Sequence, residues 1–235
     1  MSNFQPQPAW ISASTAETGM RIRAFIRSVY AWMFGGLLLT AFASVWVVSS
    51  PAMQQLVRNP MVLIVLIIAE FGLVFGISAG LRRFSAATAA SMFLVYALLN
   101  GLTLSFIFFA YTASSIVQAF VVAGGMFGAM SVYGMVTKRD LTSWGSFFFM
   151  GLIGIVICAV VNLFVHSSVM SFVISIIGVF VFVGLTAWDT QKLKSYATVG
   201  GPMQENLAIF GALALYLDFV NLFLFLLRIL GDRRR

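Results

Sequence analysis

The chain has 235 residues, of which 61% are hydrophobic and 9% are charged, and its mean hydropathy is +1.01. Soluble domains are about 45–50% apolar and about 25% charged, so this composition excludes an ordinary soluble protein and predicts an integral membrane protein. The net charge of +7 does not indicate a nucleic-acid partner, because the basic residues lie in short loops and tails between apolar segments. Cys158 is the single cysteine, which excludes an intramolecular disulfide, and we expect it to pack as a small apolar residue.

Seven long apolar runs follow one another along the chain. Each has close to the ~20 residues that an α-helix needs to cross a hydrocarbon core, and such continuous runs exclude the alternating strands of a barrel. The predicted fold class is therefore all-α, a polytopic membrane protein with seven transmembrane helices. Residues 1–20 are a polar N-terminal tail in which we see no removable signal peptide, and residues 21–235 form the transmembrane domain. The predicted spans are 26–48, 61–81, 87–110, 114–136, 145–165, 170–191 and 206–230.

Basic residues gather in alternate loops, which by the positive-inside rule predicts a cytoplasmic N-terminus. They occur before the first span and after the second, fourth and sixth, whereas the other loops carry only Arg58 and His166. The C-terminal Arg233, Arg234 and Arg235 disagree, because seven full crossings leave them outside. Either the last helix crosses despite this tail, or it enters and returns; the earlier loops favour the full crossing.

Two kinds of polar or small residue within the spans are expected to be structural. Asn100 and Asn162 are predicted to make interhelical hydrogen bonds rather than ligand contacts. Glycines recur at four-residue spacing in the second and fourth spans, which predicts close helix packing there. These glycines are Gly72, Gly76, Gly80, Gly124 and Gly128.

Two acidic residues lie inside the last two spans of a chain that has only seven Asp and Glu. A charged residue in hydrocarbon costs roughly 2.5–3.5 kcal/mol on insertion scales, and it is kept mainly where it lines a cavity, pairs with a partner, or carries ions or protons. Asp218 is near the middle of the last span, where Ala214 and Asn221 share its face. Asp189 is near the cytoplasmic end of the sixth span. Because a short connection makes these spans antiparallel, the two aspartates can meet inside the bundle.

Two carboxyl groups in contact cannot both ionise cheaply, so they share protons and titrate in coupled steps. When deprotonated they offer hard oxygen ligands that suit Ca²⁺, although two side chains fall short of the roughly 6–8 oxygens of a tight site. Asp189 and Asp218 therefore predict a pH sensor and ion pathway with weak, transient metal binding. A purely structural pair is the alternative.

Three further charged residues are candidates for the same site. Glu70 lies midway through the second span, where it either faces the same cavity as part of a pathway or gate, or packs as a protonated side chain. Arg82 and Arg83 follow this span, and they serve either as topology signals or as a latch on a carboxyl of the pair. The only histidine, His166, lies in a loop, so a histidine-based metal site is excluded.

The segments that surround the two aspartates are the most distinctive in the chain. They are Ala212-Leu-Ala-Leu-Tyr-Leu-Asp-Phe-Val-Asn221 and Val183-Gly-Leu-Thr-Ala-Trp-Asp-Thr-Gln-Lys-Leu-Lys194. They resemble the Bax inhibitor family, the transmembrane Bax-inhibitor-motif proteins, in particular its bacterial branch, and the likeness runs from about residue 21 to the end. The resemblance implies seven helices with the last one central, a bacterial inner membrane, and a pH-sensitive Ca²⁺ leak channel.

In this family a pair of aspartates is described as a sensor that opens when its protons leave, and an arginine is described as a latch on that pair. By motif, Asp189 and Asp218 match the two aspartates. Arg82 or Arg83 falls near the latch, and Glu70 aligns loosely with an acid in the second helix.

Other functions compete with a leak channel. Some bacterial members are linked to a membrane-bound AAA protease, so an inner-membrane regulatory protein that binds such a protease is the alternative, with residues 1–20 as a handle. An intramembrane aspartyl protease needs Gly-x-Gly-Asp on its second helix, whereas Leu215-Tyr-Leu217 precede Asp218. We therefore expect no enzyme and no cofactor, with the lipid bilayer, protons and transported Ca²⁺ as partners.

Overall fold

The computed structural model describes residues 9–81, 83–199 and 202–234. Seven of the helices in these segments are long and apolar enough to cross a membrane, which confirms the predicted all-α class and number of spans. In chain order the helices are α1 (Ala9–Ser49), α2 (Pro51–Val57), α3 (Pro60–Gly80), α4 (Ala86–Leu104), α5 (Phe106–Ala110), α6 (Ala113–Val136), α7 (Thr142–Val165), α8 (Ser168–Tyr196) and α9 (Pro202–Leu230).

The helix boundaries differ from the predicted spans at three places. α1 begins at Ala9, so residues 9–20 of the expected polar tail continue into the first span as one helix. The third span is interrupted at Ser105, which separates α4 from α5. α8 continues to Tyr196, beyond the expected end at residue 191, because Lys192 and Lys194 are good helix formers and cations suit a helix C-terminus.

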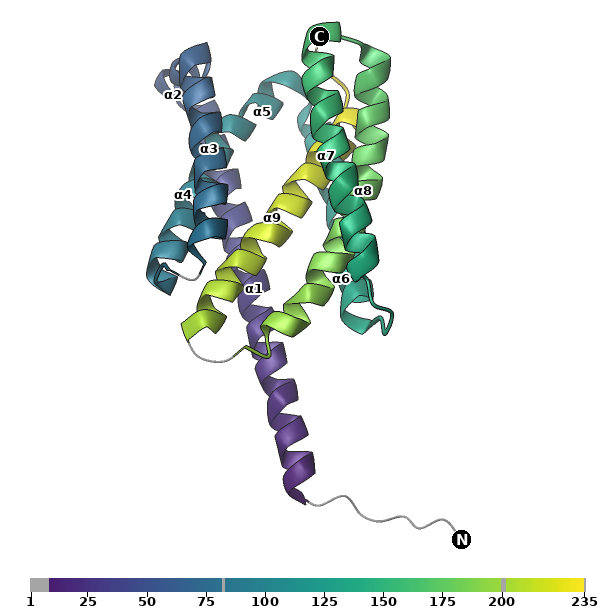
Figure 1. Ribbon diagram of the computed structural model, residues 1–235. Helices are drawn as coiled ribbons and strands as arrows, with labels where there is room; N and C mark the ends of the chain where they lie inside the picture. The colour runs from purple at the N-terminus through teal and green to yellow at the C-terminus, as the bar shows by residue number, and fades with distance from the viewer. Residues whose placement is uncertain (1–8, 82, 200–201, 235) are drawn as a thin grey trace.

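α9 is the central helix, as the family resemblance implies. In its most apolar stretch 67% of the residues are buried, against 6% in α3 and in α7. Figure 1 shows α9 crossing between the α3–α4 pair and the α7–α8 pair, and α1, α6 and α8 also pack against it. The exposed apolar side chains of the outer helices form the surface that contacts lipid. Cys158 is exposed on this surface of α7, so the prediction that it packs as a small apolar residue is wrong.

Close backbone contacts between helices occur at two glycines that were not predicted, whereas the predicted Gly76 of α3 lies against the Met92 side chain of α4. Gly134 of α6 packs directly on the carbonyl of Ala187 in α8, and Gly101 of α4 packs on the backbone of Thr40 in α1. A Cβ atom at either glycine would collide with this backbone, so these contacts require glycine. The predicted packing role is wrong for three glycines where a Cβ would meet nothing within 4 Å, namely Gly72, Gly124 and Gly128.

The N-terminal end of α1 and the C-terminal end of the chain lie on opposite sides of the bundle (Figure 1). The segment after α9 pairs with the α5–α6 connection: Thr112 N donates to the Asp232 carbonyl at 3.2 Å, and Arg234 N donates to the Ala110 carbonyl at 3.0 Å. That connection follows the third span, on the side opposite to the start of the first. The last helix therefore crosses completely, and the alternative in which it enters and returns is wrong.

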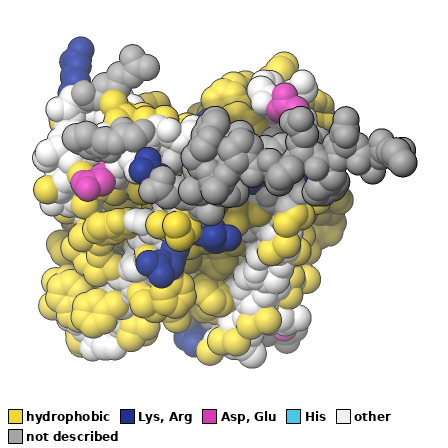
Figure 2. All heavy atoms as spheres, turned by 90° about the horizontal axis from the view of Figure 1, so that it is seen from below, with side chains coloured by type: hydrophobic (Ala, Val, Ile, Leu, Met, Phe, Trp, Pro, Cys, Tyr) yellow, Lys and Arg dark blue, Asp and Glu magenta, His cyan; other side chains and the backbone are white. Residues whose placement is uncertain are grey.

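Two amide side chains fix the loops on the N-terminal side of the bundle. Gln191 accepts from Leu141 N and donates to the Arg139 carbonyl, both at 2.8 Å, and thereby holds the α6–α7 loop. Asn206 donates to the Phe84 carbonyl at 2.8 Å and holds the α3–α4 loop. Figure 2 shows this end of the molecule, where Lys and Arg side chains lie among hydrophobic ones. Exposed basic residues before α1's apolar stretch and in these loops are Arg21, Arg23, Arg27, Arg83, Lys138 and Arg139.

Candidate functional site

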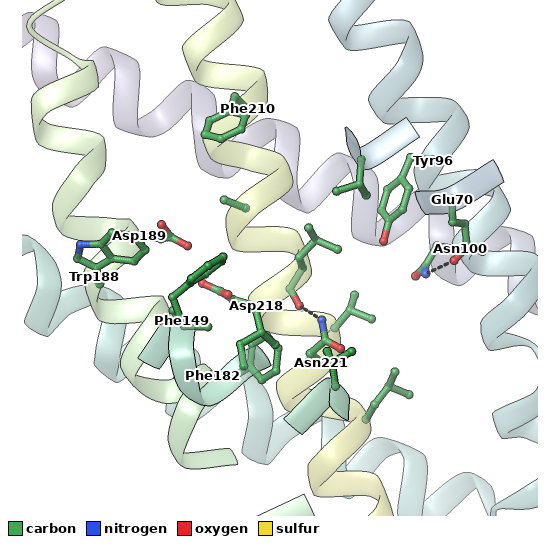
Figure 3. A pocket seen from close by; sticks show the side chains of 18 of the residues that line it. Glu70, Tyr96, Asn100, Phe149, Phe182, Trp188, Asp189, Phe210, Asp218 and Asn221 are labelled. Atoms are coloured by element: carbon green, nitrogen blue, oxygen red, sulfur yellow. Dashed lines mark hydrogen bonds between the residues drawn. The ribbon is translucent and has the colours of Figure 1, made fainter. Parts of the chain in front are cut away.

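A cavity of about 590 Å³ lies along one face of α9. Its volume is within the range of about 300–1,000 Å³ that is typical of ligand sites. Residues of α3, α4, α7, α8 and α9 line it, and most of its wall is apolar (Figure 3). The polar and charged residues in its lining are Glu70, Tyr96, Asn100, Asp189, Lys192, Asp218 and Asn221.

The two aspartates of the last two spans meet in this cavity. Figure 3 shows Asp189 of α8 and Asp218 of α9 pointing toward one another, and the two carboxyl groups are close enough to interact electrostatically. Asp218 is 4% exposed, whereas the Asp189 side chain is 17% exposed. Ala214 and Asn221, which share the face of Asp218, are half-exposed and line the cavity. The antiparallel packing of α8 and α9 thus brings together the residues that the sequence singled out.

One oxygen of the pair has an unmet hydrogen-bonding requirement. Asp218 Oδ2 is buried and receives no hydrogen bond from any donor among the described residues. A buried ionised carboxylate without a donor or a counter-ion is costly. The oxygen is therefore satisfied by a proton shared with Asp189, or by a cation or water that enters the cavity.

Lys192 is the basic residue that accompanies the pair. Its Nζ lies 3.7 Å from Asp189 Oδ1 and 4.2 Å from the centroid of the Trp188 ring. The ammonium therefore contacts Asp189, the more exposed of the two aspartates, from the side nearer the C-terminal end of α8. In the sequence Lys192 is one of the basic residues that indicate topology after the sixth span, although its three-residue spacing from Asp189 on a helix was the available indication of contact.

Of the two predicted latch arginines, the structure describes only Arg83. Arg82 lies outside the described residues. Arg83 is exposed in the loop after α3, and within the described part of the chain the ion pair made by the two aspartates is the one between Asp189 and Lys192. A latch role for Arg82 or Arg83 stays a prediction.

Glu70 faces the same cavity from α3, on the far side of α9 from the aspartates (Figure 3). Its Oε1 accepts from Thr103 Oγ1 at 2.5 Å, and its Oε2 accepts from Asn100 Nδ2 at 3.4 Å. Tyr216 donates to Asn100 Oδ1 at 2.9 Å, and its hydroxyl also contacts Thr40 Oγ1 at 2.6 Å. We call these five residues the Glu70 cluster; they connect α3, α4, α9 and α1.

The interhelical hydrogen bonds predicted for Asn100 and Asn162 are confirmed. Asn162 of α7 donates to Ser171 Oγ of α8 at 2.7 Å. Tyr216 and Thr40 were not predicted as partners, because a lone hydroxyl within an apolar run does not disturb the hydrophobic pattern. The signal that was available is that a buried tyrosine hydroxyl normally has a polar partner.

The arrangement can exchange protons and can bind a cation, but it is not a complete metal cage. Among the described residues, no group of three or more His, Cys, Asp or Glu side chains is placed to hold a metal ion. A Ca²⁺ ion at Asp189 and Asp218 would take its remaining ligands from water or backbone carbonyls. Such a site favours brief occupancy.

These features define a class: a polytopic helical membrane protein with a buried pair of carboxyl groups in a cavity beside its central helix. The family model described as "Inhibitor of apoptosis-promoting Bax1" matches residues 22–235. The chain therefore belongs to the Bax inhibitor family.

The relatives of the chain are bacterial proteins of similar length. The inner membrane protein YbhL of Escherichia coli is 48% identical over 228 residues, which cover 95% of this chain and 97% of YbhL. The protein RP147 of Rickettsia prowazekii is 44% identical over 215 residues, 91% of each chain. A protein of Deinococcus radiodurans is 44% identical over 225 residues, 95% of this chain and 96% of its own.

Proposed function

We propose that the protein is a pH-sensitive passive leak channel for Ca²⁺ or a related cation, with Asp189 and Asp218 as its sensor and part of its ion path. The observation that supports the proposal is the buried Asp218 Oδ2, which lacks a donor and lies beside a second carboxyl. At low pH a shared proton satisfies this oxygen. At higher pH the proton leaves, and the charge that remains attracts a cation.

Two carboxylates suit transient passage better than storage. Conduction requires binding that is favourable enough for entry and weak enough for exit. Beyond the pair, toward the C-terminal end of α9, the buried side chains of Phe219, Val220 and Phe223 are apolar. We infer that this arrangement is a closed form, from which conduction requires α9 to shift against its neighbours.

The same proposal assigns secondary roles to charged residues near the cavity. Glu70 acts as a gate at the second acidic position, and Arg82 or Arg83 acts as a latch that holds the closed form. The leak needs no energy source, resident cofactor or enzymatic step, and Ca²⁺ is its cargo.

We further propose a bacterial inner membrane as the location, with the N-terminus in the cytoplasm. The relative YbhL is named as an inner membrane protein, which supports this location, and the basic loops on the N-terminal side of the bundle support the orientation. A reporter that is active only outside the cytoplasm, fused after Arg235, should be active. A second reporter, which is active only inside the cytoplasm, should be inactive when it is fused at the same position. Activity of this second reporter would contradict the orientation.

Calcium entry into proteoliposomes tests the channel proposal. Purified full-length protein should admit Ca²⁺ down its gradient without nucleotide, faster at about pH 8 than at about pH 6. Vesicles without protein give the background. Entry equal to that background at every pH, from protein shown to be folded, would overturn the proposal.

The second candidate function is a regulator that binds a membrane AAA protease. It is favoured by the first turns of α1, which project away from the bundle in Figure 1 and carry exposed Arg21 and Arg23. This candidate predicts co-purification with such a protease that survives Asp218→Asn and is lost when residues 1–20 are removed.

A further inference from the structure

One face of the central helix is left uncovered by the rest of the bundle. Most of α9 is buried, but a stripe of residues at four- and three-residue spacing is half-exposed and lines the cavity. α3 packs mainly on α4, and α7 packs mainly on α8, so these helices flank the stripe without covering it. The stripe consists of Phe210, Ala214, Leu217, Asn221 and Leu224.

The groove formed by this stripe and its flanking helices opens toward the bilayer. Phe71 on the α3 side and Phe149 and Val156 on the α7 side line the cavity and are themselves 61%, 53% and 53% exposed. Side chains of this kind on a membrane helix face acyl chains. A molecule dissolved in the bilayer can therefore enter the groove sideways, without first crossing the aqueous face of the protein.

The chemistry inside the groove favours a cation with an apolar body. Three carboxyl side chains line it, against the single ammonium of Lys192. Asp218 is more than nine-tenths buried and its Oδ2 has no donor among the described residues, and the Trp188 ring, which also lines the groove, already accepts one ammonium. The remaining walls are apolar and suit an alkyl chain.

We propose that this groove binds amphiphilic ammonium ions, that is, protonated amines with an alkyl chain, which enter from the bilayer. The ammonium donates to Asp218 Oδ2 and pairs with the two carboxyls, and the alkyl chain lies along the α9 stripe. The site shares Asp189 and Asp218 with the proposed channel, but binding does not require that the protein conduct ions. A direct binding measurement therefore tests this inference separately from the proposed function.

Quenching of Trp188 fluorescence by a brominated octylamine, at about pH 8 and with full-length protein in nanodiscs, reports occupancy of the groove. Brominated octanol is the matched uncharged probe, since it has the same chain without the ammonium. The chain has five tryptophans, so the Trp188→Phe variant gives the signal to subtract. We expect saturable quenching by the amine, and only weak, linear quenching by the alcohol as it partitions into lipid.

Two variants establish where the amine binds. Asp218→Asn keeps the side-chain shape and should weaken binding by at least about tenfold, because it removes a charge-assisted hydrogen bond. Asp232→Asn is the matched control, since Asp232 is an exposed aspartate outside the groove, and it should bind like wild type. Ala214→Phe fills the groove while retaining both carboxyls, and it should also abolish saturable quenching.

Two results would show that the amine does not bind in the groove. Equal quenching by amine and alcohol would mean that both simply partition into the bilayer. Saturable quenching that is unchanged in both Asp218→Asn and Ala214→Phe would place the amine elsewhere. Either result would reject the groove as its site. If Asp218→Asn fails to fold, Ala214→Phe alone decides between the groove and another site.

Discussion

The aspartate pair and the Glu70 cluster are two ways of keeping an acid in the interior of the same membrane protein. In the Glu70 cluster, Thr103 donates to one carboxyl oxygen and Asn100 donates to the other. In the aspartate pair, Asp218 Oδ2 faces another carboxyl and receives no hydrogen bond from the described residues. The two clusters line opposite sides of one cavity, so their surroundings are comparable. They differ in the hydrogen bonds that the buried carboxyl oxygens receive.

This difference in hydrogen bonding indicates that the network around Glu70 stabilises the bundle, whereas the aspartate pair is kept for its proposed function. A satisfied buried network fixes the helices that contribute to it, and the Glu70 cluster connects four of them. An unsatisfied buried acid lowers stability and persists where that cost serves another purpose. The contrast predicts that mutations in the pair change the pH response of the leak, whereas mutations of the four residues that support Glu70 in its cluster change stability and leave the proposed gating carboxyl in place.

The largest effect is expected for Asp218→Asn. The amide supplies a donor next to Asp189 and removes a buried acid, so we expect the variant to be more stable by about 1–3 kcal/mol. The same variant should lose the pH response of the leak. Thermal unfolding followed by circular dichroism measures the first effect, and calcium entry measures the second. A variant that is clearly less stable would show that the pair is structural.

Tyr216→Phe should have the opposite profile. It removes the hydroxyl that donates to Asn100 and contacts Thr40, so the free energy of unfolding should fall by about 1 kcal/mol while the pH response of the leak is kept. Tyr133→Phe is the control, because Tyr133 is an exposed tyrosine on α6. If Tyr216→Phe lost the pH response of the leak, the Glu70 cluster and the aspartate pair would act together as one functional unit, and the contrast would be wrong.

Lys192→Gln tests whether the ammonium next to Asp189 sets the pH at which the leak opens. The ammonium favours the ionised form of the neighbouring carboxyl, so without it the half-maximal leak should move to higher pH, by roughly 0.2–0.7 pH unit for a partly exposed ion pair. Lys194→Gln, two residues further along α8, is the matched control and should leave the midpoint unchanged. A shift of equal size in both variants would indicate a general surface-charge effect.

The smallest effect is expected at an acid outside both clusters. Asp140, in the α6–α7 loop, accepts from the Thr142 hydroxyl and from Thr142 N, and these hydrogen bonds lower the pKa of its carboxyl below the usual 3.8. A lowered folded-state pKa stabilises the protein above the unfolded-state value, and this contribution is lost as the pH falls through the folded-state value. Asp140→Asn should therefore be slightly less stable than wild type at neutral pH, and the difference in melting temperature should shrink as the pH falls below 3.8 and vanish below the folded-state pKa. A difference that persists in acid would point to a cause other than the charge.

The spans and the two aspartates were predictable because their signals are local. Apolar runs of the right length identify membrane helices, and seven were found where seven were expected. Acids are so scarce in this chain that Asp189 and Asp218 stand out on composition alone. The pattern could not show the break at Ser105, because it depends on packing, and it ended α8 before its basic residues although the helix continues to Tyr196.

The partners of the acids were less predictable because they depend on contacts between distant segments. Lys192 has the appearance of a topology signal until its position next to Trp188 and Asp189 is known. Tyr216 and Thr40 are 176 residues apart, and neither belongs to a polar pattern. The glycines at which helices approach closely were likewise set by the arrangement of the bundle, so Gly134 mattered while Gly124 and Gly128 did not.

The most direct test of the central claim is the rate of Ca²⁺ entry into proteoliposomes, measured between about pH 6 and pH 8 for wild type, Asp189→Asn and Asp218→Asn. The account predicts a wild-type leak that rises with pH, and a response that is flattened in both variants, because either substitution ends the sharing of protons between two carboxyls. A wild-type leak with the same dependence on pH in both variants would contradict the claim that the pair is the sensor.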